Sequence, residues 1–268
     1  RRPYKSPVPT MGKAAVKSLF HLILTAATFV LAAVTVLASR SGHYHPESST
    51  VMPLLGLAVP VLLVSCLIVS LCWAVARKKW AFVTLIAFFF NWEYLTAVIR
   101  FGSARDIPAT ASAPNRQGKP GGYLTVATYN VHNFGNEITG YSCKEIARYM
   151  RQQHVVQDAA ETLHENFVKR AAQTDSICHL AIAAPHPVLV CGDFNSLPSS
   201  YTYRRLSGFL EDGFKTGGHG YMYTYRYGKR MLRIDYAFHS PELECIDYYS
   251  PDLDLCSDHN PVIFTVKR

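Results

Sequence analysis

Charged residues are scarce in this chain of 268 residues: they make up only 17% of it, while hydrophobic residues make up 49%. A disordered chain needs the opposite balance, so intrinsic disorder is excluded. The 16 glycines and 7 cysteines are too few for a collagen-like protein or a disulfide scaffold. No two cysteines have the CxxC spacing, which argues against a zinc site. The mean hydropathy of +0.05 is high for a soluble enzyme and indicates a membrane part joined to a soluble part.

The positive charge belongs to only one of these parts. Residues 1–122 contain 13 basic and 3 acidic residues (net +10), whereas residues 123–268 contain 14 basic and 16 acidic residues (net −2). The overall charge of +8 is therefore no argument that the soluble part binds nucleic acid.

Three apolar segments predict membrane-spanning helices, at residues 18–38, 51–76 and 80–99. The first two contain no charged residue and reach the roughly 20 residues that a bilayer requires. The third ends in polar residues, so an interfacial helix is its alternative. We thus expect residues 1–100 to form a multi-pass membrane region. Residues 101–122, rich in Ala, Pro, Gly and Ser, read as a linker to a domain at 123–268.

The flanking cations predict the orientation in the cell membrane. Lys13 and Lys17 precede the first helix, and Arg77–Lys79 separate the second from the third, which places both regions in the cytoplasm. Three spans then put the C-terminal domain outside the cytoplasm, whereas two spans would reverse this.

Polar residues recur at the ends of predicted strands in the soluble half. Strand patterns at 123–129, 187–191, 231–238 and 261–266, with helical patterns at 144–172 and 199–210, indicate an α/β or α+β fold around a sheet. The polar residues beside these strands are Asn130, Asp193, Asn195, Asp235, Asp258 and His259. Taken singly, most could be turn or cap residues. A carboxylate inside an apolar strand, as at Asp235, is costly unless it is paired.

Several carboxylates in one pocket repel each other unless they bind a cation or share protons. Oxygen ligands without a Cys/His set favour Mg²⁺, or Mn²⁺, over Zn²⁺. These residues therefore suggest metal-assisted hydrolysis of a phosphoester.

Four segments resemble the endonuclease/exonuclease/phosphatase (DNase I-like) superfamily of metal-dependent hydrolases. They are ATYNVHNF (127–134), VLVCGDFNSLPSS (188–200), LRIDYAF (232–238) and SDHNPV (257–262). The resemblance implies a four-layer α/β sandwich with two packed sheets, and preceding membrane helices look like those of a group of bacterial membrane-anchored members. It also implies roles for the six polar residues. Asp193 would orient or deprotonate the attacking water, and Asn195 would hold the phosphate. Asp258 and Asn130 would position the metal, and His259, oriented by Asp235, would act as general base or phosphate ligand.

The sequence departs from the family pattern in one place. The family has a strand ending in a metal-ligating Glu, usually within a Gln-Glu pair, between the first helix and GDFN. Here the chain is shortened near Val155/Val156 and no such strand occurs. Glu137, Glu161 or Glu165 could replace the carboxylate, but none follows a strand. The alternative to an enzyme is therefore a catalytically inactive remnant or a binding protein.

The implied substrate is a phosphoester: nucleic acid, a phospholipid or a smaller molecule. Tyr221–Arg233 interleaves aromatic and basic residues, so it could contact a phosphate backbone, although an amphipathic hairpin is favoured. No protein partner is predicted.

Overall fold

The computed structural model describes residues 11–101, 123–128, 130, 156–227, 229–252 and 257–267. The chain divides into two compact units. We call Arg1–Leu37 with Val61–Asn91 the helical unit, and Ala38–Pro60 with Trp92–Arg268 the α/β unit. The predicted linker falls almost wholly outside the described residues, as does the predicted junction near Val155/Val156. The predicted domain boundary at residue 100 stays a prediction.

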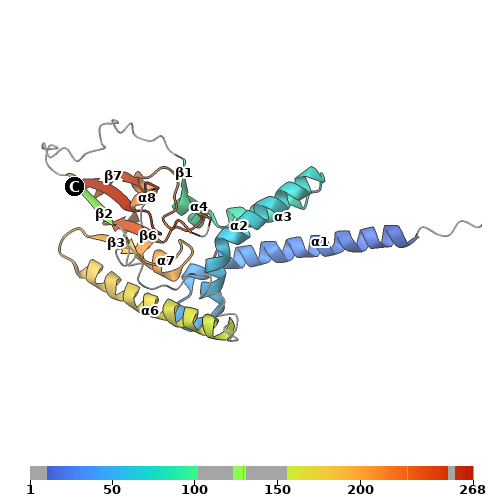
Figure 1. The fold of residues 1–268 in the computed structure, drawn as a ribbon, viewed down its shortest axis with the longest axis horizontal. Coiled ribbons are helices and arrows are strands. Elements are labelled where there is room, and N and C mark those ends of the chain that lie inside the picture. Colours follow the sequence, from blue (N-terminus) through green and yellow to red (C-terminus); the bar gives the residue numbers. More distant parts are fainter. Residues whose placement is uncertain are drawn as a thin grey trace, which may run out of the picture. The chain divides into compact units, whose positions relative to one another are not determined.

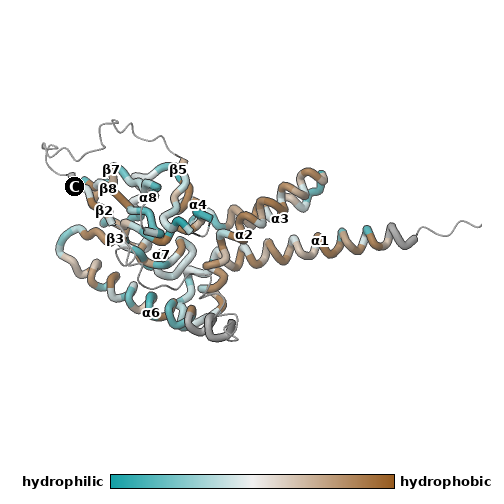
Figure 2. Tube along the Cα trace, viewed as in Figure 1, coloured by the Kyte–Doolittle hydropathy of each residue, from teal (hydrophilic) through white to brown (hydrophobic). Residues whose placement is uncertain are grey.

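Long apolar helices dominate the N-terminal third, as expected (Figures 1 and 2). Helix α1 covers Met11–Ala38 and α2 covers Val51–Val75, with short 3-10 turns at Ser41–His43 and Pro46–Ser48 between them. Both helices are long and apolar enough to cross a membrane. The third predicted span is two helices, α3 (Ala81–Phe89) and α4 (Trp92–Val98), which meet at a bend of 66°. The described residues thus hold two candidate spans, or three if the bent pair counts as one.

Hydrogen bonds between polar side chains join the three helices of the helical unit. Trp73 Nε1 donates to Thr28 Oγ1 (2.9 Å), and the hydroxyls of Ser70 and Thr84 lie 2.7 Å apart. Asn91 Nδ2 donates to the backbone oxygen of Thr35 (3.2 Å). All of these polar side chains are buried, while most large apolar side chains of the same helices are exposed.

The α/β unit contains two three-stranded antiparallel sheets. The first has the order β2 (Tyr123–Thr128), β8 (Val262–Lys267), β7 (Glu244–Tyr249). The second has the order β3 (Leu189–Asp193), β6 (Asp235–His239), β4 (Glu211–Asp212). Strands β1 (Ile99–Arg100) and β5 (Gly220–Tyr221) form a separate pair. Helices α6 (Val156–Ala183), α7 (Tyr201–Ser207) and α8 (Gly213–Gly217) complete the described elements.

Two apolar clusters hold these elements together. One lies between the two sheets and includes Phe214, Val262 and Phe264. The other packs the β3–β6–β4 sheet against α6 and α7 through Cys178, Leu206 and Phe238 (Figure 1). The described part of the unit is thus layered as sheet, sheet and helices. This agrees with the expected α/β class with two packed sheets, incomplete relative to four layers.

A buried ion pair ties helix α4 to the sheets. Arg233 is completely buried, and its guanidinium donates to both carboxylate oxygens of Asp212 at 2.7 and 2.6 Å. The same guanidinium donates to the backbone oxygen of Ala97 (2.6 Å), at the end of α4. Arg233, which the sequence placed among possible phosphate contacts, is therefore a structural residue. The rest of that segment turns back on itself, with a bridge between Tyr225 and Leu232, in keeping with the hairpin.

Candidate active site

The two middle carboxylates come together through the register of one strand pair. Asp193 is the last residue of β3, and Asp235 is the first residue of its antiparallel neighbour β6. The two are direct partners in the register, so both side chains stand at the same end of the sheet. A strand end of a rigid sheet can thus present both carboxylates to one pocket.

His259 is fixed against Asp235 by a short hydrogen bond. The distance from its Nδ1 to Asp235 Oδ2 is 2.8 Å, and both side chains are buried. The backbone N–H of Asp235 donates to Thr224 Oγ1, and the backbone N–H of His259 donates to Ser257 Oγ, each at 3.0 Å. A carboxylate on one ring nitrogen holds the imidazole in one orientation and leaves Nε2 for other contacts.

Asp193 accepts hydrogen bonds from both predicted asparagines. The backbone N–H of Asn195 donates to Oδ1 (2.8 Å), while the side-chain amides of Asn195 and Asn130 donate to Oδ2 at 2.9 and 3.0 Å. Asn195 has a positive φ of 46°, which asparagine tolerates better than most residues. Arg170 of α6 donates to the backbone oxygen of Asn195 and so secures this turn from the helix side.

Burial and charge shift the acidities of the two central groups in the same direction. Burial, together with the neighbouring charge of Asp235, raises the pKa of Asp193 in spite of its hydrogen bonds. Burial lowers the pKa of His259. The hydrogen bond and charge of Asp235, together with the charges of Asp193 and Asp258, raise this pKa by more than burial lowers it, so the net shift is upward. Asp193 is thus a stronger proton acceptor than an ordinary carboxylate, and His259 is more readily protonated than an ordinary imidazole.

The structure brings together all six residues that the sequence singled out. Ligand atoms of Asp193, Asp235 and His259 lie within 4.8 Å of one another. His259 Nε2 lies 3.9 Å from Asp193 Oδ2 and 4.0 Å from Asp258 Oδ1, too far for hydrogen bonds. The ligand atoms of Asp193, Asp235 and His259 are close enough together to hold one metal ion. Asn130, Asn195 and Asp258 border the same space through the contacts given above.

The donor set fits a hard divalent cation. Two carboxylates and one imidazole form the cluster, and a cation would offset the burial and mutual repulsion that raise the pKa of Asp193. Among the described residues, no glutamate belongs to this cluster. Glu165 is exposed and pairs with Lys169 (3.6 Å) on α6, while the side chains of Glu137 and Glu161 lie outside the described residues.

The sequence pattern did not predict three residues that support the site: Arg170, Thr224 and Ser257. Each acts through the backbone of a site residue or of its neighbour, and none belongs to a chemical pattern. Ser257 shows a weak signal, since it lies within the SDHNPV segment. Arg170 and Thr224 come from segments that carry no family motif, so only the fold reveals them.

The fold and the cluster define an α/β protein with a carboxylate–imidazole cluster at one end of a sheet. The model of the endonuclease/exonuclease/phosphatase family matches residues 84–259, more than half of the chain. The chain belongs to this family. A second model, for a domain of unknown function (DUF8431), matches residues 20–98. No curated protein matches the chain.

Part of this chain is similar to several solved structures, among them the following three. An endonuclease/exonuclease/phosphatase from Bacteroides vulgatus has 26% identity and a TM-score of 0.33, over 37% of this chain and 43% of that one. A mannosyl-6-phosphatase from Bacteroides thetaiotaomicron has 20% identity and a TM-score of 0.28, over 37% and 44%. The human Nocturnin catalytic domain with bound sulfate has 23% identity and a TM-score of 0.30, over 37% and 41%. This chain thus spans less than half the length of each.

Proposed function

We propose that this protein is a membrane-anchored, divalent-metal-dependent phosphoester hydrolase. The observation that carries the proposal is the convergence of Asp193, Asp235 and His259, whose ligand atoms lie within 4.8 Å of one another. Their chemistry matches the roles that the family resemblance implies for them.

The raised pKa values of Asp193 and His259 suit these two residues to different roles in hydrolysis. Asp193, with its raised pKa, is suited to accept a proton from the attacking water. His259, also with a raised pKa, is suited to donate a hydrogen bond from Nε2 to a phosphate oxygen while Asp235 holds Nδ1. Asn195 would contact the phosphate, and Asp258 and Asn130 would help to hold Mg²⁺ or Mn²⁺. When bound, the cation would neutralise negative charge on the phosphate oxygens.

The pairing of cations disfavours a long nucleic acid as substrate. Arg226 and Arg230 both lie near Asp252, at 3.6 and 3.1 Å, and Arg233 is buried with Asp212. Affinity for nucleic acid depends on cationic side chains that contact phosphates. Arginines that already pair with aspartates are therefore poorly suited to bind the phosphate backbone of a nucleic acid. A phospholipid or a smaller phosphoester is therefore the favoured substrate.

The flanking cations support an extracytoplasmic domain at residues 123–268. Lys13 and Lys17 lie at the start of α1, and Arg77–Lys79 separate α2 from α3, and such cations favour the cytoplasmic side of a membrane. With α3 and α4 counted as one bent span, three spans then put the C-terminal domain outside the cytoplasm.

A reporter fused to the C-terminus tests this orientation in the cell membrane. A fluorescent protein that matures only in the cytoplasm should stay dark on the full chain, while a fusion after Lys79 should fluoresce. Fluorescence from the C-terminal fusion would contradict the proposal.

One observation favours the second candidate, an inactive remnant or binding protein. No glutamate contacts the cluster among the described residues, so an anionic ligand typical of the family is not supplied there. The two candidates differ in one measurable property, which is metal-dependent turnover.

Hydrolysis of bis(p-nitrophenyl) phosphate with and without Mg²⁺ by the purified full chain decides between them. His259→Ala should reduce the rate by about 10²–10⁴, the usual contribution of a positioned acid or base. Asp193→Ala should have a loss of similar size. His219→Ala, which changes an exposed histidine of the same unit, serves as the matched control and should retain the rate.

Two results would refute the proposed hydrolase site. Turnover that survives both site substitutions would mean that another protein or another site hydrolyses the ester. Absence of Mg²⁺- or Mn²⁺-dependent turnover in a preparation with cooperative thermal unfolding would instead favour the inactive remnant.

A further inference from the structure

A cavity beside Asn195 has a character quite different from that of the carboxylate cluster. Its volume is about 80 Å³, and its apolar lining includes Pro53, Leu57, Phe167, Leu197, Leu232 and Ile234. About 10–15 Å³ of such space holds one water molecule, so the cavity has room for several methylene groups. Ligand sites typically combine an apolar lining with a few placed polar groups.

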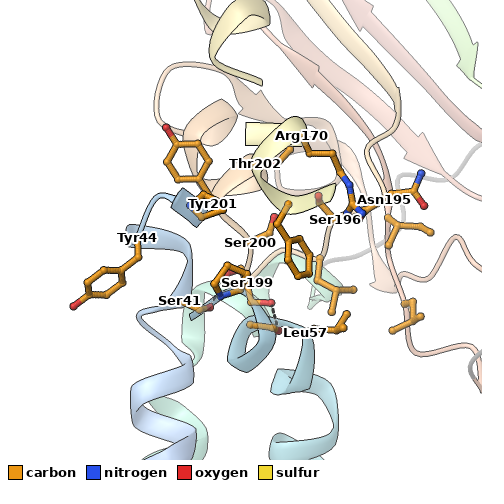
Figure 3. A pocket seen from close by; sticks show the side chains of 17 residues that line it. Ser41, Tyr44, Leu57, Arg170, Asn195, Ser196, Ser199, Ser200, Tyr201 and Thr202 are labelled. Atoms are coloured by element: carbon orange, nitrogen blue, oxygen red, sulfur yellow. Dashed lines mark hydrogen bonds between the residues drawn. The ribbon is translucent and has the colours of Figure 1, made fainter. Parts of the chain in front are cut away.

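The polar end of the cavity adjoins the candidate active site. Asn195 and Arg170 line it (Figure 3), and Ile234, another lining residue, directly precedes Asp235 in the sequence. Among the described residues, Arg170 is the one charged residue of the lining, and its guanidinium donates to the backbone oxygen of Asn195. The charge of Asp193 also acts on Arg170, because it opposes the burial that lowers the pKa of this arginine. The lining thus includes a cation that interacts with the charge of Asp193.

The wall opposite this end is built by the segment that joins α1 to α2. Ser41 Oγ donates to the backbone oxygen of Ser199 (2.8 Å), and Ser199 Oγ donates to the backbone oxygen of Gly56 (2.7 Å). A Cβ atom at Gly42 would lie 2.9 Å from the backbone oxygen of Ser200, so this wall fits only with a glycine there. Figure 3 shows Ser41 and Leu57 on one side of the loop with Ser199, and Arg170 and Asn195 on the other. Hydrogen bonds and close backbone packing therefore fix this wall of the cavity in place.

Part of this wall belongs to helix α2, which indicates the kind of ligand that the cavity binds. Pro53, Gly56 and Leu57 belong to α2, a continuous apolar helix long enough to cross a membrane. A ligand with an aliphatic chain would meet this helix in the bilayer and would match the apolar lining. A free sugar phosphate would leave that lining in contact with polar groups, at a cost.

We propose that this cavity binds the aliphatic part of a membrane lipid phosphoester, with the phosphate at Arg170 and Asn195. The assignment rests on the proposed hydrolase function and adds the substrate class to it. Arg170 acts as a positioning residue that draws the phosphate toward Asp193 and His259, while the apolar lining selects for the chain.

Chain-length dependence of hydrolysis tests the cavity in the full protein reconstituted in lipid nanodiscs. The probes are methyl p-nitrophenyl phosphate and hexyl p-nitrophenyl phosphate, which carry the same reactive phosphate. Each buried methylene favours binding by about fourfold. We expect kcat/KM to be at least tenfold higher for the hexyl ester. Equal values for the two esters would overturn the proposal.

Two matched leucines of α2 separate the cavity from general partition into lipid. Leu57 lines the cavity and is 46% exposed, whereas Leu67 lies outside the lining and is 45% exposed. Leu57→Gln should reduce the hexyl-to-methyl ratio to less than threefold, and Leu67→Gln should preserve it. A ratio that is unchanged in Leu57→Gln, or lost equally in both variants, would contradict the cavity.

Calorimetric binding of hexyl phosphate and methyl phosphate tests the cavity independently of turnover, with empty nanodiscs as the partition control. Binding of hexyl phosphate that is at least tenfold tighter and sensitive to Leu57→Gln, without hydrolysis, would uphold the cavity and refute the hydrolase. Hydrolysis with equal affinities for the two phosphates would uphold the hydrolase and refute the cavity.

Discussion

The two units of this protein distribute polar and apolar side chains in opposite ways. In the helical unit, Thr84 is fully buried while Phe82, two residues earlier, is 65% exposed. In the α/β unit, aromatic residues such as Phe238 and Phe264 are fully buried, and exposed positions are mostly polar. The usual folding of a soluble protein in water explains the second pattern but not the first.

The difference teaches which solvent each unit is built for. Lipid does not drive apolar side chains inward, so helices in a membrane associate through close packing and hydrogen bonds. The Trp73–Thr28 and Ser70–Thr84 bonds are of that kind. In the described part of the α/β unit, buried charged groups find several partners at Asp212–Arg233 and around Asp193. We therefore infer lipid around the helical unit and water around the sheets of the α/β unit.

Breaking the buried ion pair of the α/β unit should have the largest effect. Asp212→Ala leaves the guanidinium of Arg233 buried without its anion, and such a loss costs about 3–5 kcal/mol of unfolding free energy. Asp252→Ala, which removes a partly exposed partner of Arg226 and Arg230, should cost about 1 kcal/mol or less. Urea unfolding followed by near-UV circular dichroism measures both variants. Equal losses would mean that Arg233 reaches solvent.

A lysine on an exposed helix surface distinguishes lipid from water directly. Ile68 of α2 and Ile182 of α6 are exposed by 57% and 65%, respectively. Ile68→Lys should oppose membrane insertion of α2 by about 2.5 kcal/mol, a cost typical of a charge in a spanning helix. Ile182→Lys should change stability by less than about 0.5 kcal/mol, like other surface substitutions. A glycosylation reporter measures insertion for Ile68→Lys, and thermal unfolding measures Ile182→Lys. Unimpaired insertion of Ile68→Lys would place α2 in water.

Alkaline pH should unfold the α/β unit selectively. Burial raises the pKa of Tyr203 well above its usual range and raises the pKa of Tyr248 to about 12. An unfolded tyrosine titrates near pH 10, so the folded state binds more protons between about pH 10 and 12. Stability that is fully present below pH 10 should then decrease by up to about 1.4 kcal/mol per pH unit for each tyrosine.

The helical unit provides the internal control for this titration, since residues 11–37 and 61–91 contain no tyrosine. Between pH 10 and 12, near-UV circular dichroism of the α/β unit should be lost while most far-UV helical signal remains. Simultaneous loss of both signals would indicate that the units unfold together.

The sequence predicts the central residues of the site better than it predicts the residues that hold the surrounding fold together. Asp193 ends β3, Asp235 begins β6 and His259 lies shortly before β8, and the antiparallel register of β3 with β6 brings the two carboxylates together. The role of Arg233 could not be predicted, because its local sequence resembles that of Arg226 and Arg230, and its partner Asp212 is distant along the chain. The bend between α3 and α4 was also missed, since hydropathy measures composition and not direction.

The smallest expected difference between the two units concerns single hydrogen bonds. Trp73→Phe removes the bond from Nε1 to Thr28 and should cost about 0.6 kcal/mol, the average for side-chain bonds between membrane helices. Tyr203→Phe removes a bond of 2.7 Å to the carboxylate of Asp212 and should cost about 1.5–3 kcal/mol, because the acceptor is charged and buried. Unfolding in detergent and urea gives both values. A loss for Trp73→Phe that equals or exceeds the loss for Tyr203→Phe would mean that the helical unit folds like a water-surrounded core.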